Sequence, residues 1–185
     1  MTQDDSRIAS LLDRIDAGER IKWLFFWGHT ASGLDVGKAC LSQWFPSAFE
    51  VSGIRYMTAE HWMMAEKARL FGDEDALAKI LEAEHPGEAK ALGRKVQNFD
   101  EATWARERYE IVVRGSIAKF SAHDRLRAFL LGTSNRVLVE ASPRDQIWGI
   151  GLGASNPRAE NPGAWRGLNL LGFALMDARE HLSTS

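Results

Sequence analysis

The chain has a single cysteine, Cys40, among its 185 residues. One thiol excludes an internal disulfide and a four-thiolate metal site within one chain. The five histidines are scattered, and no two have the i, i+4 spacing that presents paired metal ligands on a helix. Gly149–Ala154 fits the loose dinucleotide pattern, but no helix follows it and no βαβ unit surrounds it. We therefore expect neither a metal nor a cofactor.

Long apolar runs and a strong net charge are also missing. No apolar segment approaches the ~20 residues of a membrane span, and the first residues do not resemble a secretory signal. The 23 basic and 25 acidic side chains give a formal net charge of −2, which argues against a general nucleic-acid binder. We therefore expect a cytoplasmic protein without a membrane partner, whose oligomeric state these observations do not define.

The hydrophobic pattern predicts a mainly α fold, in one domain with a minor β-hairpin and short strands. Apolar residues at helical spacing from Ile8 to Ile15, followed by Gly18, predict a helix in an N-terminal extension at 1–20, ahead of a domain at 21–183. Strands are expected at 21–27 and 137–140, a hairpin at 49–56 turning at Ser52-Gly53, and loops at 28–38 and 141–166. The other expected helices lie at 58–71, 74–84, 86–94, 100–119, 122–131 and 167–182.

One of these helices carries an acid and an amine on the same face. Glu60 and Lys67 are seven residues apart, which places them ~20° apart around a helix and roughly 10 Å apart along it. Charged groups on a largely apolar face are costly unless they are paired or used. The pattern therefore indicates a functional pair. A solvated charged face, or Lys67 reaching outward from the edge of the core, would explain the same spacing without a function.

A second group of residues lies between Glu140 and Gly151, in the long loop. Asp145, Trp148 and the glycines combine an acid, a flat ring and a backbone that a ligand can approach closely. This combination is typical of a wall around a nucleoside-like ligand. The alternative is a turn in which Asp145 accepts hydrogen bonds from local amides and Trp148 fills the core.

Together, these segments resemble the YbiA-like, or NADAR, family. The resemblance runs in the family's order over roughly residues 22–182 and leaves out the N-terminal helix. The matching segments are Phe25–Trp27, Leu41–Pro46, Thr58–Lys67, Leu92–Arg94, Trp104, Lys119-Phe120, Leu130–Thr133, Leu138–Glu140, Asp145–Gly149, Asn169–Gly172, and Leu175-Met176 with Arg179.

The resemblance implies a YbiA-like helical fold and an N-glycosidase. One activity of that family hydrolyses the ribose C1–N bond of ribosylamino-pyrimidine phosphates, which are early intermediates of riboflavin synthesis. Another removes ADP-ribose from guanine bases. We expect the first activity, and the alternatives are the second activity or a non-catalytic module that binds ADP-ribose or related nucleotides. The partner is then a small ribosyl-phosphate or ADP-ribosyl molecule, and nucleic acid enters only as an ADP-ribosylated substrate.

Carried onto this sequence, the family's motifs imply catalytic roles for Glu60, Lys67 and Asp145. Lys67 is expected to attack C1 of ring-opened ribose and form a Schiff base, while Glu60 and Asp145 share acid–base and charge-stabilising roles. Trp104 and Trp148 are expected to stack on the base, and Trp27 and Trp44 to line the pocket or the core. The full set of expected substrate contacts is Phe26, Trp27, Trp44, Arg94, Trp104, Trp148, Gly149 and Asn169.

Overall fold

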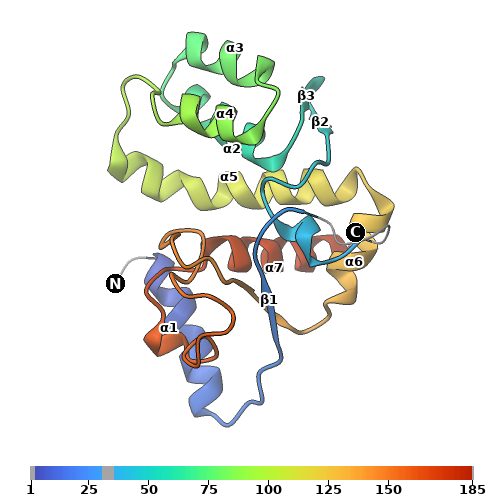
Figure 1. Ribbon diagram of the computed structural model, residues 1–185, viewed down its shortest axis with the longest axis vertical. Helices are drawn as coiled ribbons and strands as arrows, with labels where there is room; N and C mark the ends of the chain where they lie inside the picture. The colour runs from blue at the N-terminus through green and yellow to red at the C-terminus, as the bar shows by residue number, and fades with distance from the viewer. Residues whose placement is uncertain (1–2, 31–35, 185) are drawn as a thin grey trace.

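Two long helices, α5 (Glu101–Ser121) and α7 (Leu170–Ser183), pack side by side in the middle of the molecule (Figure 1). The computed structural model describes residues 3–30 and 36–184, with side chains from Ser6 onward. The fold is mainly helical, as the hydrophobic pattern predicts. No helix among the described residues is long and apolar enough to cross a membrane.

Three helices cover the side of α5 that faces away from α7. They are α2 (Ala59–Leu70), α3 (Glu74–Glu82) and α4 (Pro86–Gly93). Helix α6 (Asp124–Gly132) follows α5 in the chain and contacts both α5 and α7. Helices α2, α3, α4 and α5 each start at a side chain that caps the first turn, whereas α6 and α7 start without a side-chain cap. The expected boundaries hold to within a few residues.

Helix α2 contacts α3, α4 and α5 and is buried on most of its circumference. It begins after Thr58, whose hydroxyl accepts a hydrogen bond from the backbone N–H of His61. The indole of Trp62 donates to the carbonyl of Ile111 on α5, at 2.8 Å. Gly115 makes this close approach possible, because a Cβ at that position would collide with the Trp62 ring. Helix α2 is therefore held rigidly in place beside the site described below.

The strands are short and form two separate pairs. Strand β1 (Trp23–Phe26) runs parallel to β4 (Val137–Glu140), with Phe26 opposite Glu140. Strands β2 (Phe49–Val51) and β3 (Ile54–Tyr56) form the expected hairpin, and positive φ angles at Ser52 and Gly53 confirm its turn. Because β1 and β4 are parallel, the chain leaves both strands at the same edge.

Three boundaries differ from the expected ones. Strand β1 is limited to four residues, because only Trp23–Phe26 finds partners on β4. The loop expected at 28–38 ends in a short 3₁₀ helix, η1 (Lys38–Leu41), and its residues 31–35 lie outside the described residues. The last helix begins at Leu170 instead of residue 167, because the N–H groups of Leu168 and Asn169 bind carbonyls of the preceding loop.

The N-terminal helix α1 (Gln3–Asp16) packs on the opposite side of α7 from α5 (Figure 1). It is the helix expected around Ile8–Ile15, and Gly18 follows it with a positive φ, as a helix-ending glycine does. Helix α1 also contacts η2 (Pro162–Ala164), a turn within the loop between β4 and α7. It thereby covers the lower face of α7 and part of that loop.

Candidate active site

A cavity of about 780 Å³ lies between α4, the N-terminal end of α5 and the loop that follows β4. Its volume is within the range of small-molecule sites. Four residues expected at the site from the sequence meet in its wall, although they come from three segments: Arg94, Trp104, Asp145 and Trp148. The cavity also exposes side chains that the sequence did not single out, among them Lys90, Ser142, Arg144 and Ile147.

Asp145 is held in a fixed position by its own loop. Its Oδ1 atom accepts hydrogen bonds from the backbone N–H groups of Ile147 (2.9 Å) and Trp148 (2.7 Å). This is an Asx turn, which was the alternative interpretation of the segment. The same turn places Asp145 and the Trp148 ring in the cavity wall, so the local turn and the cavity are built from the same residues.

Gly149 has a packing role in this loop. A Cβ at this position would lie 2.9 Å from the carbonyl oxygen of Glu140 and 3.0 Å from Cβ of Ser142. A larger residue would therefore push the loop away from the end of β4. Gly149 is buried, and its contribution to the site is the close seating of Trp148 and Asp145.

Glu60 is fully enclosed in the first turn of α2, with 2% of its surface exposed. The Trp44 side chain donates a hydrogen bond to its carboxyl group, while its Oε1 atom has no hydrogen-bond partner among the described residues. Burial raises the pKa of Glu60 to about 7, and the charges of Lys90 and Arg94 limit the rise. Near neutral pH this carboxyl group is therefore poised between its two protonation states.

Glu140, at the end of β4, is a second carboxyl group of this kind. It is partly exposed, yet its Oε2 atom is buried and has no hydrogen-bond partner among the described residues. Burial, together with the negative charges of Asp145 and Glu60, raises its pKa to about 8. Glu140 was not among the site residues expected from the sequence, although an acid at the carboxyl end of a buried strand in a parallel pair is a useful signal for a site.

These acids do not form a metal site. Among residues 3–30 and 36–184, no group of three or more histidine, cysteine, aspartate and glutamate side chains is arranged to hold an ion. What the arrangement provides instead is two carboxyl groups, Glu60 and Glu140, whose pKa values are raised by burial, with the charge of Lys90 partly opposing the rise in both.

Lys67 does not line this cavity. Its ammonium group lies in a slot formed by two aromatic rings. Its Nζ atom is 4.1 Å from the centre of the Phe99 ring and 5.4 Å from that of Trp104. Burial lowers the pKa of Lys67, and the nearby carboxylate of Glu101 opposes the change. Trp104 connects this slot to the cavity, because its ring also lines the cavity wall.

Two further tryptophans lie in contrasting surroundings. Trp44 packs edge-on against His85, at 5.7 Å, and its ring is 5.9 Å from Nζ of Lys90. Trp44 therefore supports the buried Glu60 from one side and contacts the Lys90 cation on the other. Trp27 directly follows β1 and leaves 64% of its surface exposed, so its ring is free to contact a ligand at the edge where both strands end.

Phe26 and Asn169 need a correction, because their side chains face the interior. Phe26 is 1% exposed and belongs to the hydrophobic core. Asn169 is fully buried, accepts a hydrogen bond from the N–H of Glu140 (2.9 Å) and donates to the carbonyl of Leu138 (3.0 Å). Both residues shape the β1–β4 edge and do not present their side chains to a ligand.

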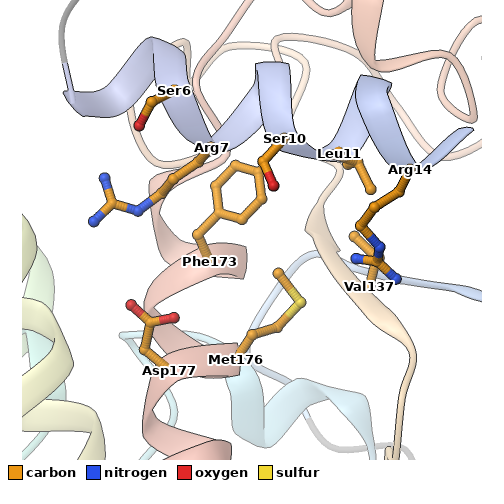
Figure 2. Close-up of a pocket in the computed structure, with 9 residues that line it drawn as sticks. All are labelled: Ser6, Arg7, Ser10, Leu11, Arg14, Val137, Phe173, Met176 and Asp177. Carbon is orange, nitrogen blue, oxygen red and sulfur yellow. The ribbon is translucent and has the colours of Figure 1, made fainter. Parts of the chain in front are cut away.

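A second cavity, of about 280 Å³, lies between α1 and α7 (Figure 2). Its two arginines are already engaged, because Arg14 pairs with Glu19 and the guanidinium of Arg7 stacks over the Tyr109 ring at 3.5 Å. None of the site residues expected from the sequence lines it. The 780 Å³ cavity is therefore the candidate active site.

Comparison with known proteins identifies the family of this chain. The sequence model of the NADAR domain family matches residues 25–183. An N-glycosidase of Acanthamoeba polyphaga mimivirus is 42% identical over 167 residues, which cover 88% of this chain and 97% of that protein. N-glycosidase YbiA of Escherichia coli (strain K12) is 32% identical over 134 residues, covering 72% and 75% of the two chains.

The fold is shared as well. The NMR structure of the E. coli protein YbiA superposes with a TM-score of 0.71, at 27% sequence identity, and the match covers 90% of this chain and 88% of that one. Family model, relatives and solved structure all point to the same group of proteins. The chain therefore belongs to the NADAR family and is an enzyme of the N-glycosidase class.

Proposed function

We propose that this N-glycosidase hydrolyses the ribose C1–N bond of ribosylamino-pyrimidine phosphates. The observation that carries the proposal is the polarity of the 780 Å³ cavity. Cations of Lys90, Arg94 and Arg144 line the cavity, and Asp145 supplies an acidic side chain near the buried carboxyl groups of Glu60 and Glu140. A ribosylamino-pyrimidine phosphate has the matching parts, which are an anionic phosphate, a ribose and a flat heterocycle.

The cavity orients such a substrate by charge and by stacking. Arginine and lysine bind phosphate through charge-assisted hydrogen bonds, so the phosphate belongs beside Arg94 and Arg144. The indole rings of Trp104 and Trp148 offer broad faces for the pyrimidine. In this orientation, the bond to be cleaved lies between the rings and the carboxyl groups.

We assign the chemistry of the reaction to Asp145, Glu60 and Lys67. Cleavage of the C1–N bond develops positive charge on the ribose, which the Asp145 carboxylate stabilises. Glu60, poised near neutral pH, serves as an acid–base group. The lowered pKa of Lys67 increases the fraction of its neutral amine. That amine adds to C1 of the ring-opened sugar, the base leaves with a proton, and water then hydrolyses the lysine imine.

The competing substrate is ADP-ribose attached to a guanine base. Three cations around one cavity could accommodate a diphosphate as well as a single phosphate, which is the observation in its favour. We keep the ribosylamino-pyrimidine phosphate as the proposal because it requires no surface for a nucleic acid, and the chain has a formal net charge of −2.

The test offers both compounds to the purified protein in parallel and follows release of the base by chromatography. We expect release from the ribosylamino-pyrimidine phosphate, and Asp145→Asn should abolish it. Release only from ADP-ribosylated guanosine would replace the proposed substrate. Release from neither, combined with tight binding of ADP-ribose, would favour a binding module. The cytoplasmic location remains a prediction, which cell fractionation tests.

A further inference from the structure

We propose that Glu140 is the general acid of the reaction, the group that gives its proton to the leaving nitrogen. The assignment rests on the proposed active site, but it does not depend on which N-glycoside is the substrate. Any C1–N cleavage that expels an amine requires a proton donor on the nitrogen.

The first support is that the Glu140 backbone is fixed from two sides. Its N–H donates to Oδ1 of Asn169, and its carbonyl accepts from the N–H of Ile150 at 3.0 Å. Ser142, two residues further on, lines the cavity. Glu140 therefore lies at a fixed strand end, and its carboxyl group interacts electrostatically with Asp145 and Lys90, which both line the cavity.

The second support is the unequal environment of the side chain. Glu140 keeps some solvent access, while its Oε2 atom is buried without a hydrogen-bond partner among the described residues. One oxygen of the carboxyl group is therefore enclosed while the residue as a whole is still partly exposed. An unpaired buried oxygen is costly, and the cost is smaller when the carboxyl group is protonated and donates to a bound substrate.

The third support is electrostatic, and it involves three other segments. Glu60 from α2 and Asp145 from the loop face Glu140 with negative charge, whereas Lys90 from α4 partly compensates them. With burial, these charges keep the pKa of Glu140 at about 8, so the acid is mostly protonated at pH 7. Asp145, whose Oδ1 accepts two backbone N–H bonds, is held in position to stabilise the charge that develops on the sugar. Neighbouring carboxyl groups thereby divide the acid and charge-stabilising roles.

In the proposed step, the Glu140 proton passes to the nitrogen of the base as the C1–N bond breaks. The bonding electron pair goes to that nitrogen, and the base leaves as a neutral amine. Carbon C1 is then bonded to the Lys67 amine or to water. The water that finally hydrolyses the sugar returns a proton to the Glu140 carboxylate, so no further reactant is needed.

The experiment compares Glu140→Gln with wild type on two leaving groups. One substrate is the N-glycoside that the wild type cleaves, and the other is a nitrophenyl riboside phosphate, whose leaving group departs without a proton. For the N-glycoside we expect kcat to fall at least ~100-fold, as for loss of a general acid, and the alkaline limb of the pH profile to disappear. For the nitrophenyl riboside phosphate, kcat of Glu140→Gln should fall only a few-fold.

Two further variants separate chemistry from structure. Glu82→Gln is the matched control, because Glu82 is an exposed glutamate at the end of α3 and its loss should change neither rate. Glu140→Asp keeps an acid and should retain part of the activity on the N-glycoside. The assignment would be overturned if kcat of Glu140→Gln fell equally on both substrates, or if it matched the wild type on both.

A spectroscopic readout needs no substrate. Infrared difference spectra between pH 6 and pH 9 should show protonated carboxyl bands of Glu60 and Glu140 that disappear as pH rises; Glu140→Gln should lose the Glu140 band and keep that of Glu60. An ionised Glu140 at pH 7 would overturn the assignment, even if the enzyme cleaves its substrate. A wrong substrate, by contrast, would be seen in the wild type itself, which would leave the ribosylamino-pyrimidine phosphate intact.

Discussion

At the scale of single residues, the protonation states of Lys67, Glu60 and Glu140 dominate the behaviour of the site. All three are shifted toward neutrality by burial. A neutral amine is a nucleophile and a neutral carboxyl group is a proton donor, whereas their charged forms are neither. The same burial that prepares them for chemistry costs folding free energy, because it disfavours their charged forms.

Lys67 should form a covalent adduct with the sugar. Incubation with substrate and borohydride is expected to trap a reduced imine on Lys67, detected by peptide mass spectrometry, and Lys67→Ala should lose nearly all activity. Lys79→Ala is the control, because Lys79 is exposed on α3. Normal turnover without any trapped adduct would argue against the Schiff base, and full activity of Lys67→Ala would remove this residue from catalysis.

Trp148→Ala should impair catalysis more than folding. Stacking of a base on an aromatic ring contributes about 1–3 kcal/mol, so kcat/KM should fall roughly five- to 150-fold at that energy. Trp104→Ala should also lower kcat/KM, with some loss of stability because Trp104 is 8% exposed. By comparison, Trp62→Ala should mainly destabilise the fold, since its ring fills the α2–α5 interface. Activity assays and urea unfolding distinguish the two kinds of effect.

Glu60→Gln should stabilise the protein at alkaline pH. The pKa of Glu60 is raised from 4.5 to about 7 in the folded state. Between these values the folded protein holds a proton that the unfolded chain has lost, so the free energy of unfolding falls as pH rises. Removing the acid should therefore add about 3 kcal/mol at pH 8 and little at pH 4. Urea unfolding at both values checks this, and an equal effect at both would contradict it.

At the scale of elements, α5 supports the site through the buried Lys119. Its Nζ atom donates to the carbonyls of Cys40 (2.6 Å) and Ser42 (2.8 Å). The carbonyl of the next residue, Gln43, accepts the N–H of Glu60, and Trp44 then donates to the Glu60 carboxyl group. A single lysine thus ties the segment that carries Trp44 to the central helix.

Lys119→Met should weaken this connection. Two carbonyl groups would lose a buried donor, for which we expect about 2–4 kcal/mol of lost stability. The Trp44 hydrogen bond should loosen as well, which would shift the pH dependence of activity upward because that bond lowers the pKa of Glu60. Lys38→Met, at an exposed lysine of η1, is the control. Unchanged unfolding and an unchanged pH profile in Lys119→Met would contradict this role.

At the scale of the whole molecule, α1 lies outside the segment that matches the family model. The family match begins at residue 25, and α1 covers Val137, Phe173 and Met176 from one side of α7 (Figure 2). Leu11 of this helix is buried there. The candidate active site lies elsewhere, around the N-terminal end of α5. Stability and activity should therefore depend differently on this helix.

Deleting residues 1–20 should lower the melting temperature and leave base release within a few-fold of that of the full chain. The lost burial of Leu11 and its neighbours provides the reason for the lower stability. Calorimetry and the base-release assay measure the two effects separately. A truncated protein that remains folded but loses activity would show that α1 contributes to the site.

The sequence determined the helices, because their apolar spacing and capping residues act over only a few positions. It also placed Asp145 and Trp148 together, since one turn carries both. Tertiary structure decided that Glu60, Lys90, Glu140 and Asp145, from four segments, act on one another. Proton affinities depend on burial and on neighbouring charges, and neither is a local property of the chain. For this reason Glu140, an ordinary acid after a short strand in the sequence, becomes the proposed proton donor only in the folded protein.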